Sequence, residues 1–489
     1  MLFNSLAYAV FLPLAFACHW LCPPRARWAV LLAFSYYFYM SWDPQLVWLI
    51  LFTTAVSWAA ALCVARAKTD VGRKAALGLG AAACLGCLFF FKYFNFAADT
   101  LHTVAAAAGF GLQPVTLQLV LPVGISFYTF QTLSYIIDVS RGTMPAERHF
   151  GYYALYVSFF PQLVAGPIER AGRLLPQLRA PRRLDAAKCT AGLQRILIGL
   201  FKKVVVADTF ATYVDAVYAD LPGKTGLTLL FSTFLFAVQI YCDFSGYSDI
   251  AVGSAALLGV DLMENFKSPY FARSVREFWR RWHISLTGWF TDYVYIPLGG
   301  SRCSRPRHMA NLLFTFFLSG LWHGAAWHFV AWGVFHGALL CLEQAYIPRL
   351  DRLQARLGRS APGLALTAAR TGYTILLATI GWVFFRAETM ADAFYVLANM
   401  WRGLNPLRIL EYMACTGMTA WGLAGVGVLL AVLAVYDGWS YYHRPALESL
   451  SAARPIWRYL VYYGAAVAIV AAWMMQPYGA AADFIYFQF

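Results

Sequence analysis

Residues 310–342 constrain the fold more than any other part of the chain. They include no Asp, Glu, Lys or Arg, and the stretch is long enough to cross the hydrocarbon core of a bilayer, which is about 30 Å thick. Three histidines, His323, His328 and His336, nevertheless lie among its tryptophans and other apolar residues. Histidine inside a membrane is energetically costly, so it usually serves a function. The stretch therefore predicts a membrane segment that carries a functional site.

The composition extends this prediction to the whole chain. Of 489 residues, 60% are hydrophobic and only 13% are charged, whereas soluble domains contain about 25% charged residues. We expect an all-α polytopic membrane protein, with residues 1–489 in a single embedded domain. The N-terminus has no basic n-region and no cleavage site, so its apolar run is interpreted as a retained first span. The net charge of +14 is attributed to basic cytoplasmic loops, with a possible added attraction for a polyanion, and not to nucleic-acid binding.

The alternation of apolar runs and basic loops predicts the topology. Arg25 and Arg27 follow the first run, and a second basic segment covers residues 170–188, so both are expected in the cytoplasm. About eleven membrane segments result, with re-entrant and interfacial helices among or beside them, and both termini are expected on the periplasmic side of a bacterial inner membrane. After the first run, the expected spans are residues 28–42, a run that ends at Arg66, 75–96, 115–137, 191–207, 226–241, 310–342, 372–385, 418–436 and 459–475.

Two segments do not look like ordinary spans. Residues 150–168 contain Pro161 and Gly166-Pro167, which favour a broken or re-entrant helix packed inside the protein. Residues 278–286 mix cations and indoles closely, a pattern typical of a helix at the cytoplasmic interface.

His323 is the strongest candidate for chemistry. Trp322 precedes it and could shield the ring, while Gly324 follows and allows close approach. A neutral imidazole in a dry pocket can take a proton from a hydroxyl near pH 7, as general-base catalysis of acyl transfer requires. A buried histidine that only packs against indoles or bonds a carbonyl is the alternative. His328 and His336 lack the Trp-His-Gly setting and are interpreted as structural.

The interfacial block supplies a second group of candidates. His283 is either solvent-facing or a second polar group that holds the acyl carbonyl or the donor. Arg280 and Arg281 are either cytoplasmic anchors or contacts to the phosphates of a donor, because guanidinium groups suit phosphate. The same candidate donor site includes Asn265, Lys267, Arg273 and Arg276 and the indoles of Trp282 and Trp322.

The remaining polar residues in apolar surroundings are expected to be structural. Asp243 and Asp249 predict a buried network that fixes helices, in preference to catalysis, and such carboxylates must be paired. Glu169 and Arg170 are expected to form a further pair. Residues 310–342 offer no carboxylate and no His-Glu-x-x-His arrangement, so no metal site is expected. No Gly-x-Ser-x-Gly elbow points to a soluble-type serine esterase.

Seven blocks of sequence together resemble the membrane-bound O-acyltransferase family, and most closely its bacterial polysaccharide O-acetyltransferases, as in alginate O-acetylation. They are VLPVGISFYTFQTLSYIIDVSRG (120–142), FFPQLVAGPIER (159–170), YCDFSGYSDIAVG (241–253), ENFKSPY (264–270), EFWRRWHISLTGWF (277–290), YIPLGGSR (295–302) and LSGLWHGAAW (318–327). The resemblance covers residues 2–386 and is weaker over the C-terminal spans in 387–475. It implies a helical fold around a central tunnel between a cytoplasmic funnel and an outer cavity. It also implies that His323 occupies the catalytic histidine position and His283 the second polar position.

The resemblance further implies a reaction and its participants. An acetyl group would come from a cytoplasmic thioester, acetyl-CoA, with no tightly bound cofactor. It would cross the membrane to an outer SGNH-type transferase that works with the polysaccharide machinery, and membrane lipids would surround the protein. Residues 168–170 are more similar to the general polysaccharide and peptidoglycan members than to the alginate members, so alginate, cellulose and peptidoglycan all remain open as acceptors. A D-alanyl or lipid acyltransferase of the same family and a non-enzymatic permease are the alternatives.

The C-terminal tail, residues 476–489, ends in FIYFQF. This ending is similar to the aromatic C-terminal motif of the small single-span peptide that works with the teichoic-acid D-alanylation member. Our hypothesis is that Tyr486 reaches the outer cavity and accepts the acyl group on its phenol before the partner takes it. An aromatic anchor at the membrane interface is the alternative.

Overall fold

The computed structural model describes residues 1–111, 113, 115–164, 166–356, 363–475 and 484–485, and every regular element in these ranges is helical. Seven helical stretches there are long and apolar enough to cross a membrane, and α1 (Leu6–Leu21) is apolar but shorter. The seven are Pro44–Arg66, Asp70–Ala107, Gly226–Leu257, Trp327–Arg349, Leu364–Arg386, Ala420–Tyr442 and Pro455–Met475. The expected all-α polytopic membrane fold is confirmed, while the count of about eleven segments stays a prediction.

The chain forms two compact units. The first comprises residues 1–196 and 250–263, and the second comprises residues 197–249 and 264–489. The prediction of one embedded domain over residues 1–489 is not tested by this division and stays a prediction.

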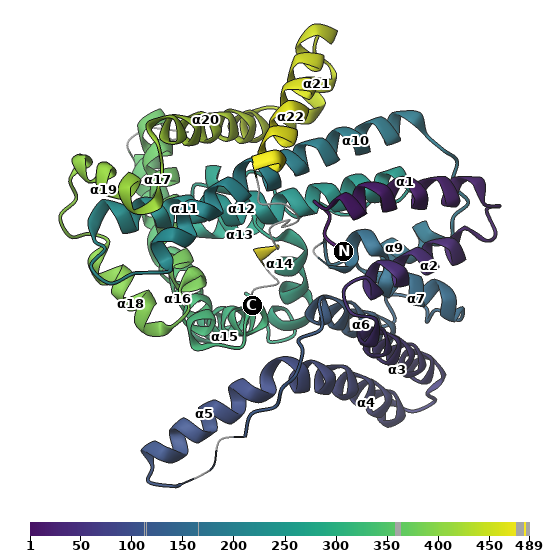
Figure 1. Ribbon diagram of the computed structural model, residues 1–489. Helices are drawn as coiled ribbons and strands as arrows, with labels where there is room; N and C mark the ends of the chain where they lie inside the picture. Colours follow the sequence, from purple (N-terminus) through teal and green to yellow (C-terminus); the bar gives the residue numbers. More distant parts are fainter. Residues whose placement is uncertain (112, 114, 165, 357–362, 476–483, 486–489) are drawn as a thin grey trace. The chain divides into compact units, whose positions relative to one another are not determined.

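Helices of the first unit pack mainly through α3, α4 and α6. Gly80 of α4 makes this possible, because a Cβ there would lie 2.5 Å from the Cβ of Ala60 in α3. Figure 1 shows α5 reaching away from the other helices of this unit. The helices are α1, α2 (Arg27–Met40), α3 (Val47–Arg66), α4 (Asp70–Leu88), α5 (Phe94–Ala107), α6 (Ile125–Ser140), α7 (Phe150–Ser158), α8 (Phe160–Leu163), α9 (Ala171–Arg179), most of α10 (Ala186–Leu200) and the end of α12 (Gly226–Leu257).

In the second unit, α15 and α16 lie side by side and make the largest helix contact (Figure 1). Between α10 and α11 the chain forms a π-helical turn, Phe201–Ala207, which carries two lysines into the core. The helices are α11 (Asp208–Tyr218), most of α12, α13 (Val275–Arg281), α14 (Ile284–Phe290), α15 (Arg305–His323), α16 (Trp327–Arg356), α17 (Leu364–Arg386), α18 (Met390–Asn399), α19 (Ile409–Thr416), α20 (Ala420–Tyr442), α21 (Ala446–Ser451) and α22 (Pro455–Met475).

Several expected boundaries are wrong. Residues 310–342 are not one span, because α15 ends at His323 and α16 begins at Trp327. The expected interfacial helix over 278–286 is two short helices with a break at Trp282 and His283. The expected span over 115–137 becomes helical only at Ile125. The expected span over 226–241 is too short, because α12 continues through Asp243 and Asp249 to Leu257. Residues 150–168 do form a broken helix, with Phe159 in a non-helical conformation (φ −51°, ψ 109°) between α7 and α8.

Candidate active site

His323 is the last residue of α15, and glycines allow its helix to pack closely on α16. A Cβ on Gly320 would lie 2.3 Å from the carbonyl oxygen of Phe329, and one on Gly333 would lie 2.2 Å from that of Phe316. The helix ends because Gly324 is extended, and a Cβ there would lie 2.1 Å from the Phe329 ring. This packing fixes His323 at the turn between the two helices.

Aromatic rings enclose the His323 imidazole. It is 4% exposed, and its centroid lies 4.8 Å from that of Trp332, 5.0 Å from that of Trp322 and 5.3 Å from that of Phe385, all edge-to-face. Such a setting excludes water from the ring, which is the dry environment that the sequence predicted for a general base.

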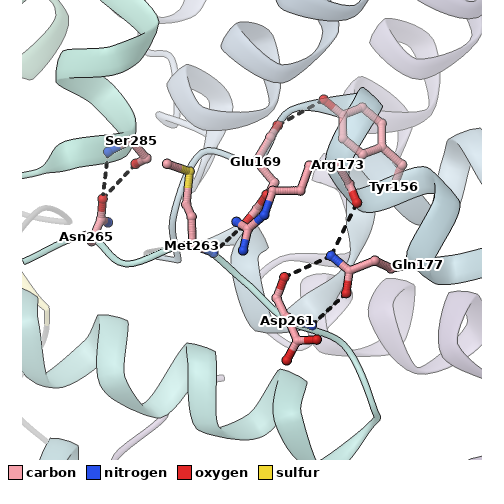
Figure 2. A network of polar contacts seen from close by, with 8 residues as sticks. All are labelled: Tyr156, Glu169, Arg173, Gln177, Asp261, Met263, Asn265 and Ser285. Carbon is pink, nitrogen blue, oxygen red and sulfur yellow. Dashed lines mark hydrogen bonds and ion pairs between the residues drawn. The ribbon is translucent and has the colours of Figure 1, made fainter. Parts of the chain in front are cut away.

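His283 is buried, and a short polar network holds it. It lies between α13 and α14 with φ 43° and ψ 55°, a left-handed conformation that is uncommon outside glycine. Asn265 Oδ1 lies 3.3 Å from His283 Nδ1 and accepts hydrogen bonds from the backbone N–H and the hydroxyl of Ser285, at 3.2 and 2.7 Å. The two Ser285 bonds are the dashed lines to Asn265 in Figure 2. The solvent-facing interpretation of His283 is therefore wrong, since the side chain is 1% exposed.

Burial also determines the charge of His283. Removal from water disfavours the imidazolium and lowers the pKa of His283 to about 3. The ring is neutral near pH 7, and its two nitrogens then offer one donor and one acceptor.

The Trp322 indole connects the two histidines. Its ring centroid lies 5.0 Å from that of His323 and 5.9 Å from that of His283. The two histidines are 40 residues apart in the sequence (323 − 283), yet they border the same indole. Their shared contact supports one site for both.

A cavity of about 400 Å³ opens beside α13 and α15. Its lining includes Arg276 and Arg280 from α13, and Ser319, which lies one helical turn before His323 in α15. Trp279 and a polar group, Tyr295, His308 and Gln344, also line it. The Tyr295 hydroxyl lies 2.7 Å from His308 Nε2. The sequence analysis did not select Tyr295, His308 or Gln344. The position of Tyr295 and His308 between the FWRRWH and LWHG blocks was a usable signal, whereas Gln344 lies after both blocks.

Glu343 fixes the direction of α13, and the sequence analysis missed it. Its carboxylate is 2% exposed and accepts from the backbone N–H groups of Val275 and Arg276, at 2.7 and 3.0 Å. A carboxylate at a helix N-terminus is stabilised by the helix dipole and by such charge-assisted bonds. Ser274 caps the same end through the Glu277 N–H. α13 is therefore held so that two of its arginines line the cavity.

The predicted donor-binding residues divide into two groups. Arg280 is exposed and lines the cavity, whereas Arg281 is bound to Glu277 at 2.9 Å and to the Lys267 carbonyl at 3.0 Å. The Lys267 side chain is exposed but is not part of the cavity lining. Trp282, Trp322 and Asn265 are buried beside the histidines, and their part in donor binding stays a prediction.

Two lysines pair the buried aspartates. Lys203 Nζ lies 2.7 Å from Asp243 and 2.9 Å from Asp208, and Lys202 Nζ lies 2.8 Å from Asp249. The paired, helix-fixing network that the sequence predicted for Asp243 and Asp249 agrees with this geometry. The sequence analysis did not select Lys202 and Lys203, in the π-helical turn, as the partners of these aspartates.

Glu169 belongs to a separate network in the first unit. Its carboxylate binds Arg173 at 2.8 Å and accepts from the Met263 N–H (Figure 2). The predicted pair with Arg170 stays a prediction. The Tyr156 hydroxyl donates to the Glu169 carbonyl. Burial raises the pKa of Glu169 despite the opposing effect of Arg173. The network ties α7, α9 and the segment after α12 together.

The other histidines of the stretch differ in their contacts. His328 Nδ1 lies 2.9 Å from the Phe384 carbonyl oxygen, and His336 packs edge-to-face against Trp279. Across the described residues, no three histidines, cysteines or carboxylates group as a metal site would require, and the metal-free site stays a prediction. Tyr486 lies outside the described residues.

Comparison with known proteins gives a consistent set of relatives. Residues 146–376 match the model of the membrane-bound O-acyltransferase family. A probable alginate O-acetylase of Azotobacter vinelandii is 37% identical over 456 residues, which cover 91% of this chain and 86% of that protein. A peptidoglycan O-acetyltransferase of Helicobacter pylori is 32% identical, with 83% of this chain and 80% of that protein covered. A teichoic acid D-alanyltransferase of Streptococcus thermophilus is 29% identical over 46% of this chain and 57% of that protein.

Proposed function

Because this chain belongs to the membrane-bound O-acyltransferase family, and is therefore a membrane O-acyltransferase, we propose that it transfers acetyl groups for O-acetylation of a polysaccharide outside the cytoplasm. The donor is a cytoplasmic acyl thioester, acetyl-CoA, and the protein lies in the bacterial inner membrane with both termini in the periplasm. An SGNH-type transferase outside the membrane completes the transfer to alginate, cellulose, peptidoglycan or a similar polymer. The alginate and peptidoglycan O-acetyltransferases among its relatives support this substrate class.

The observation that carries the proposal is the burial of His323 at the end of α15. Aromatic rings enclose it, and Ser319, one turn earlier, lines a cavity that also contains Arg276 and Arg280. Guanidinium groups bind phosphates through charge-assisted hydrogen bonds, and acetyl-CoA carries phosphates far from its thioester. The cavity therefore suits a donor with a charged end and a thin acyl end.

The proposed chemistry needs one base and one group that positions the attacking hydroxyl. His323 takes the proton of the acceptor hydroxyl as its oxygen attacks the thioester carbonyl carbon. The carbon–sulfur bond then breaks, and the thiolate leaves with the proton that His323 held. Asn265 Oδ1 can only accept, so the neutral His283 ring donates its Nδ1–H to it, and its Nε2 is left as an acceptor that can hold the attacking hydroxyl by a hydrogen bond.

Tyr486 is proposed as the first acceptor hydroxyl. Support comes from its neighbours, since Phe484 and Ile485 are buried and the Ile485 N–H donates to Asp243 at 2.8 Å. The Phe484 ring lies 5.6 Å from that of Phe244, which lies 4.6 Å from that of His283. Tyr486→Phe removes only the hydroxyl and should abolish polymer acetylation; unchanged acetylation would exclude the relay.

The main experiment compares His323→Ala with the wild type in cells. Acyl analysis of the surface polysaccharide should show acetyl esters in the wild type and loss of at least about 100-fold in the variant, because general-base catalysis contributes about 10²–10⁴-fold. His102→Ala, the same change in α5 of the first unit, is the matched control. Equal amounts of both proteins in the membrane exclude a folding defect, and acetylation that survives in His323→Ala would refute the proposed base.

A D-alanyl transfer is the second candidate, because a teichoic acid D-alanyltransferase is among the relatives. It predicts D-alanyl esters in place of acetyl esters in the same analysis, together with a carrier protein that co-purifies with the enzyme.

A further inference from the structure

A second recess, in the first unit, has the chemistry of an anion site. It lies where α1 ends and α2 begins, and its volume is about 30 Å³. The lining contains three arginines, Arg27, Arg179 and Arg182, and no Asp or Glu. The recess therefore concentrates positive charge at a small enclosed point.

The arginines are held in different ways. Arg27 donates to the backbone carbonyl of Arg182 at 2.7 Å and to that of Cys22 at 3.2 Å, and its guanidinium lies 4.8 Å from the Trp20 ring centroid. Arg179 binds Glu147 and covers the Tyr152 ring. The Nε of Arg182 is enclosed and makes no hydrogen bond with a described residue. Backbone carbonyls do not neutralise the charge of Arg27. No carboxylate lines the recess, so the charges of Arg27 and Arg182 remain available to an anion.

His19 adds a buried polar group to the same recess. It is 5% exposed, and its one polar partner among the described residues is the Leu258 backbone, which leaves a ring nitrogen without a partner there. Buried polar groups are normally satisfied, so a partner from outside the chain would complete the site. The enclosed volume admits about two oxygen-sized groups, given about 10–15 Å³ for each water-sized sphere.

A separate apolar groove is lined by the same two helices. It has a volume of about 530 Å³, and its lining comes from the N-terminus, α1 and α2, with Phe11, Leu14 and Phe34 among them. Arg27, Leu31 and Phe34 follow at i, i+4 and i+7, so one face of α2 carries the recess at its start and the groove beyond it. A charged recess next to an apolar groove matches a molecule with an anionic head and a hydrocarbon tail.

We propose that this site binds an anionic phospholipid, with its phosphate in the recess and an acyl chain in the groove. The membrane supplies this class of ligand, and basic pockets between membrane helices are known places for such headgroups. The segments that hold Arg27 and Arg182 are those that the charge pattern predicts on the cytoplasmic side, where anionic lipids attract basic residues.

The first test uses the full-length wild-type protein in detergent. Phosphatidylglycerol, phosphatidylcholine, glycerophosphoglycerol and inorganic phosphate are each titrated while bound lipid is counted by native mass spectrometry and thermal unfolding is followed. Phosphatidylglycerol should bind at least tenfold more tightly than phosphatidylcholine or the chain-free headgroup. Equal binding of both lipids would overturn the proposal, as would equal stabilisation by inorganic phosphate, which would identify a soluble anion.

The second test uses a matched pair of variants. Arg182→Gln removes a charge that lines the recess, and Arg183→Gln removes the same charge from the next residue, which is exposed and does not line it. Arg182→Gln should weaken phosphatidylglycerol binding at least tenfold, while Arg183→Gln should change it less than twofold. Equal effects of the two variants would mean a diffuse surface attraction and would overturn the site. If Arg182→Gln does not fold, the wild-type titration decides alone.

Discussion

At the scale of single residues, Arg280 and Arg281 are neighbours in the sequence with different surroundings. Arg281 is bound to Glu277 and to a backbone carbonyl, and its guanidinium lies 4.4 Å from the Tyr441 ring centroid. Arg280 is exposed and lines the cavity. Only Arg280 can contact a donor without giving up an existing ion pair.

Arg280→Gln should therefore weaken donor binding more than Arg281→Gln does. We expect KM for acetyl-CoA to rise about tenfold in Arg280→Gln, equivalent to about 1.4 kcal/mol, with little change in kcat. Arg281→Gln should instead lower thermal stability, because it removes the ion pair with Glu277. Steady-state kinetics and thermal unfolding of the two purified variants check this, and an equal rise in KM for both would contradict it.

His283 gives a prediction about pH. Its pKa in the folded protein is about 3, below the ordinary value of about 6.5. As pH falls below 6.5, the unfolded chain takes up a proton that the folded protein refuses, so stability present above pH 6.5 is lost toward pH 3.

His283→Gln removes this dependence. Between pH 7.5 and pH 5.5, the wild type should lose stability on the order of 1 kcal/mol more than the variant does. Denaturant unfolding of both proteins at the two pH values measures the difference. A parallel decline would show that His283 is protonated in the folded state.

At the scale of elements, the packing of α15 on α16 determines where His323 lies. Gly320 faces the Phe329 carbonyl without room for a Cβ, and His323 follows it by less than one turn. Any separation of these helices should move the imidazole away from Trp332 and Phe385.

Gly320→Ala should therefore reduce both stability and activity. Overpacking of a close helix contact costs on the order of 1–3 kcal/mol, and acetyl transfer should fall at least about tenfold. Gly372→Ala in α17 is the control, since a Cβ there meets no atom within 4 Å and alanine favours a helix by up to about 1 kcal/mol. If Gly320→Ala behaves as the control does, the close contact does not position His323.

At the scale of the whole molecule, orientation in the membrane follows from the distribution of charge. The stretch Asp70–Ala107 has 38 residues, about 57 Å at 1.5 Å per residue, so it exceeds a bilayer core of about 30 Å. Basic residues lie near its start, and residues 99–113 contain no Lys or Arg.

This charge asymmetry predicts opposite locations for the two ends of the stretch. A fluorescent protein fused after Lys68 should be fluorescent, as in the cytoplasm, and alkaline phosphatase fused after Gly109 should be active, as in the periplasm. Fusions at each site with the other reporter serve as controls. The reverse pattern would invert the proposed path of the acetyl group.

The sequence alone determined the fold class, the family and the residue types at the site. Apolar runs long enough to cross a bilayer are removed from water only when they lie in a membrane. The Trp-His-Gly and FWRRWH blocks are local patterns that can be recognised in the sequence without the fold. Only the tertiary structure decided which groups meet. The break at Gly324, the left-handed turn at His283 and the cap from Glu343 depend on contacts between residues far apart in the chain. No spacing in the sequence encodes such contacts, because packing and burial arise only when the helices assemble.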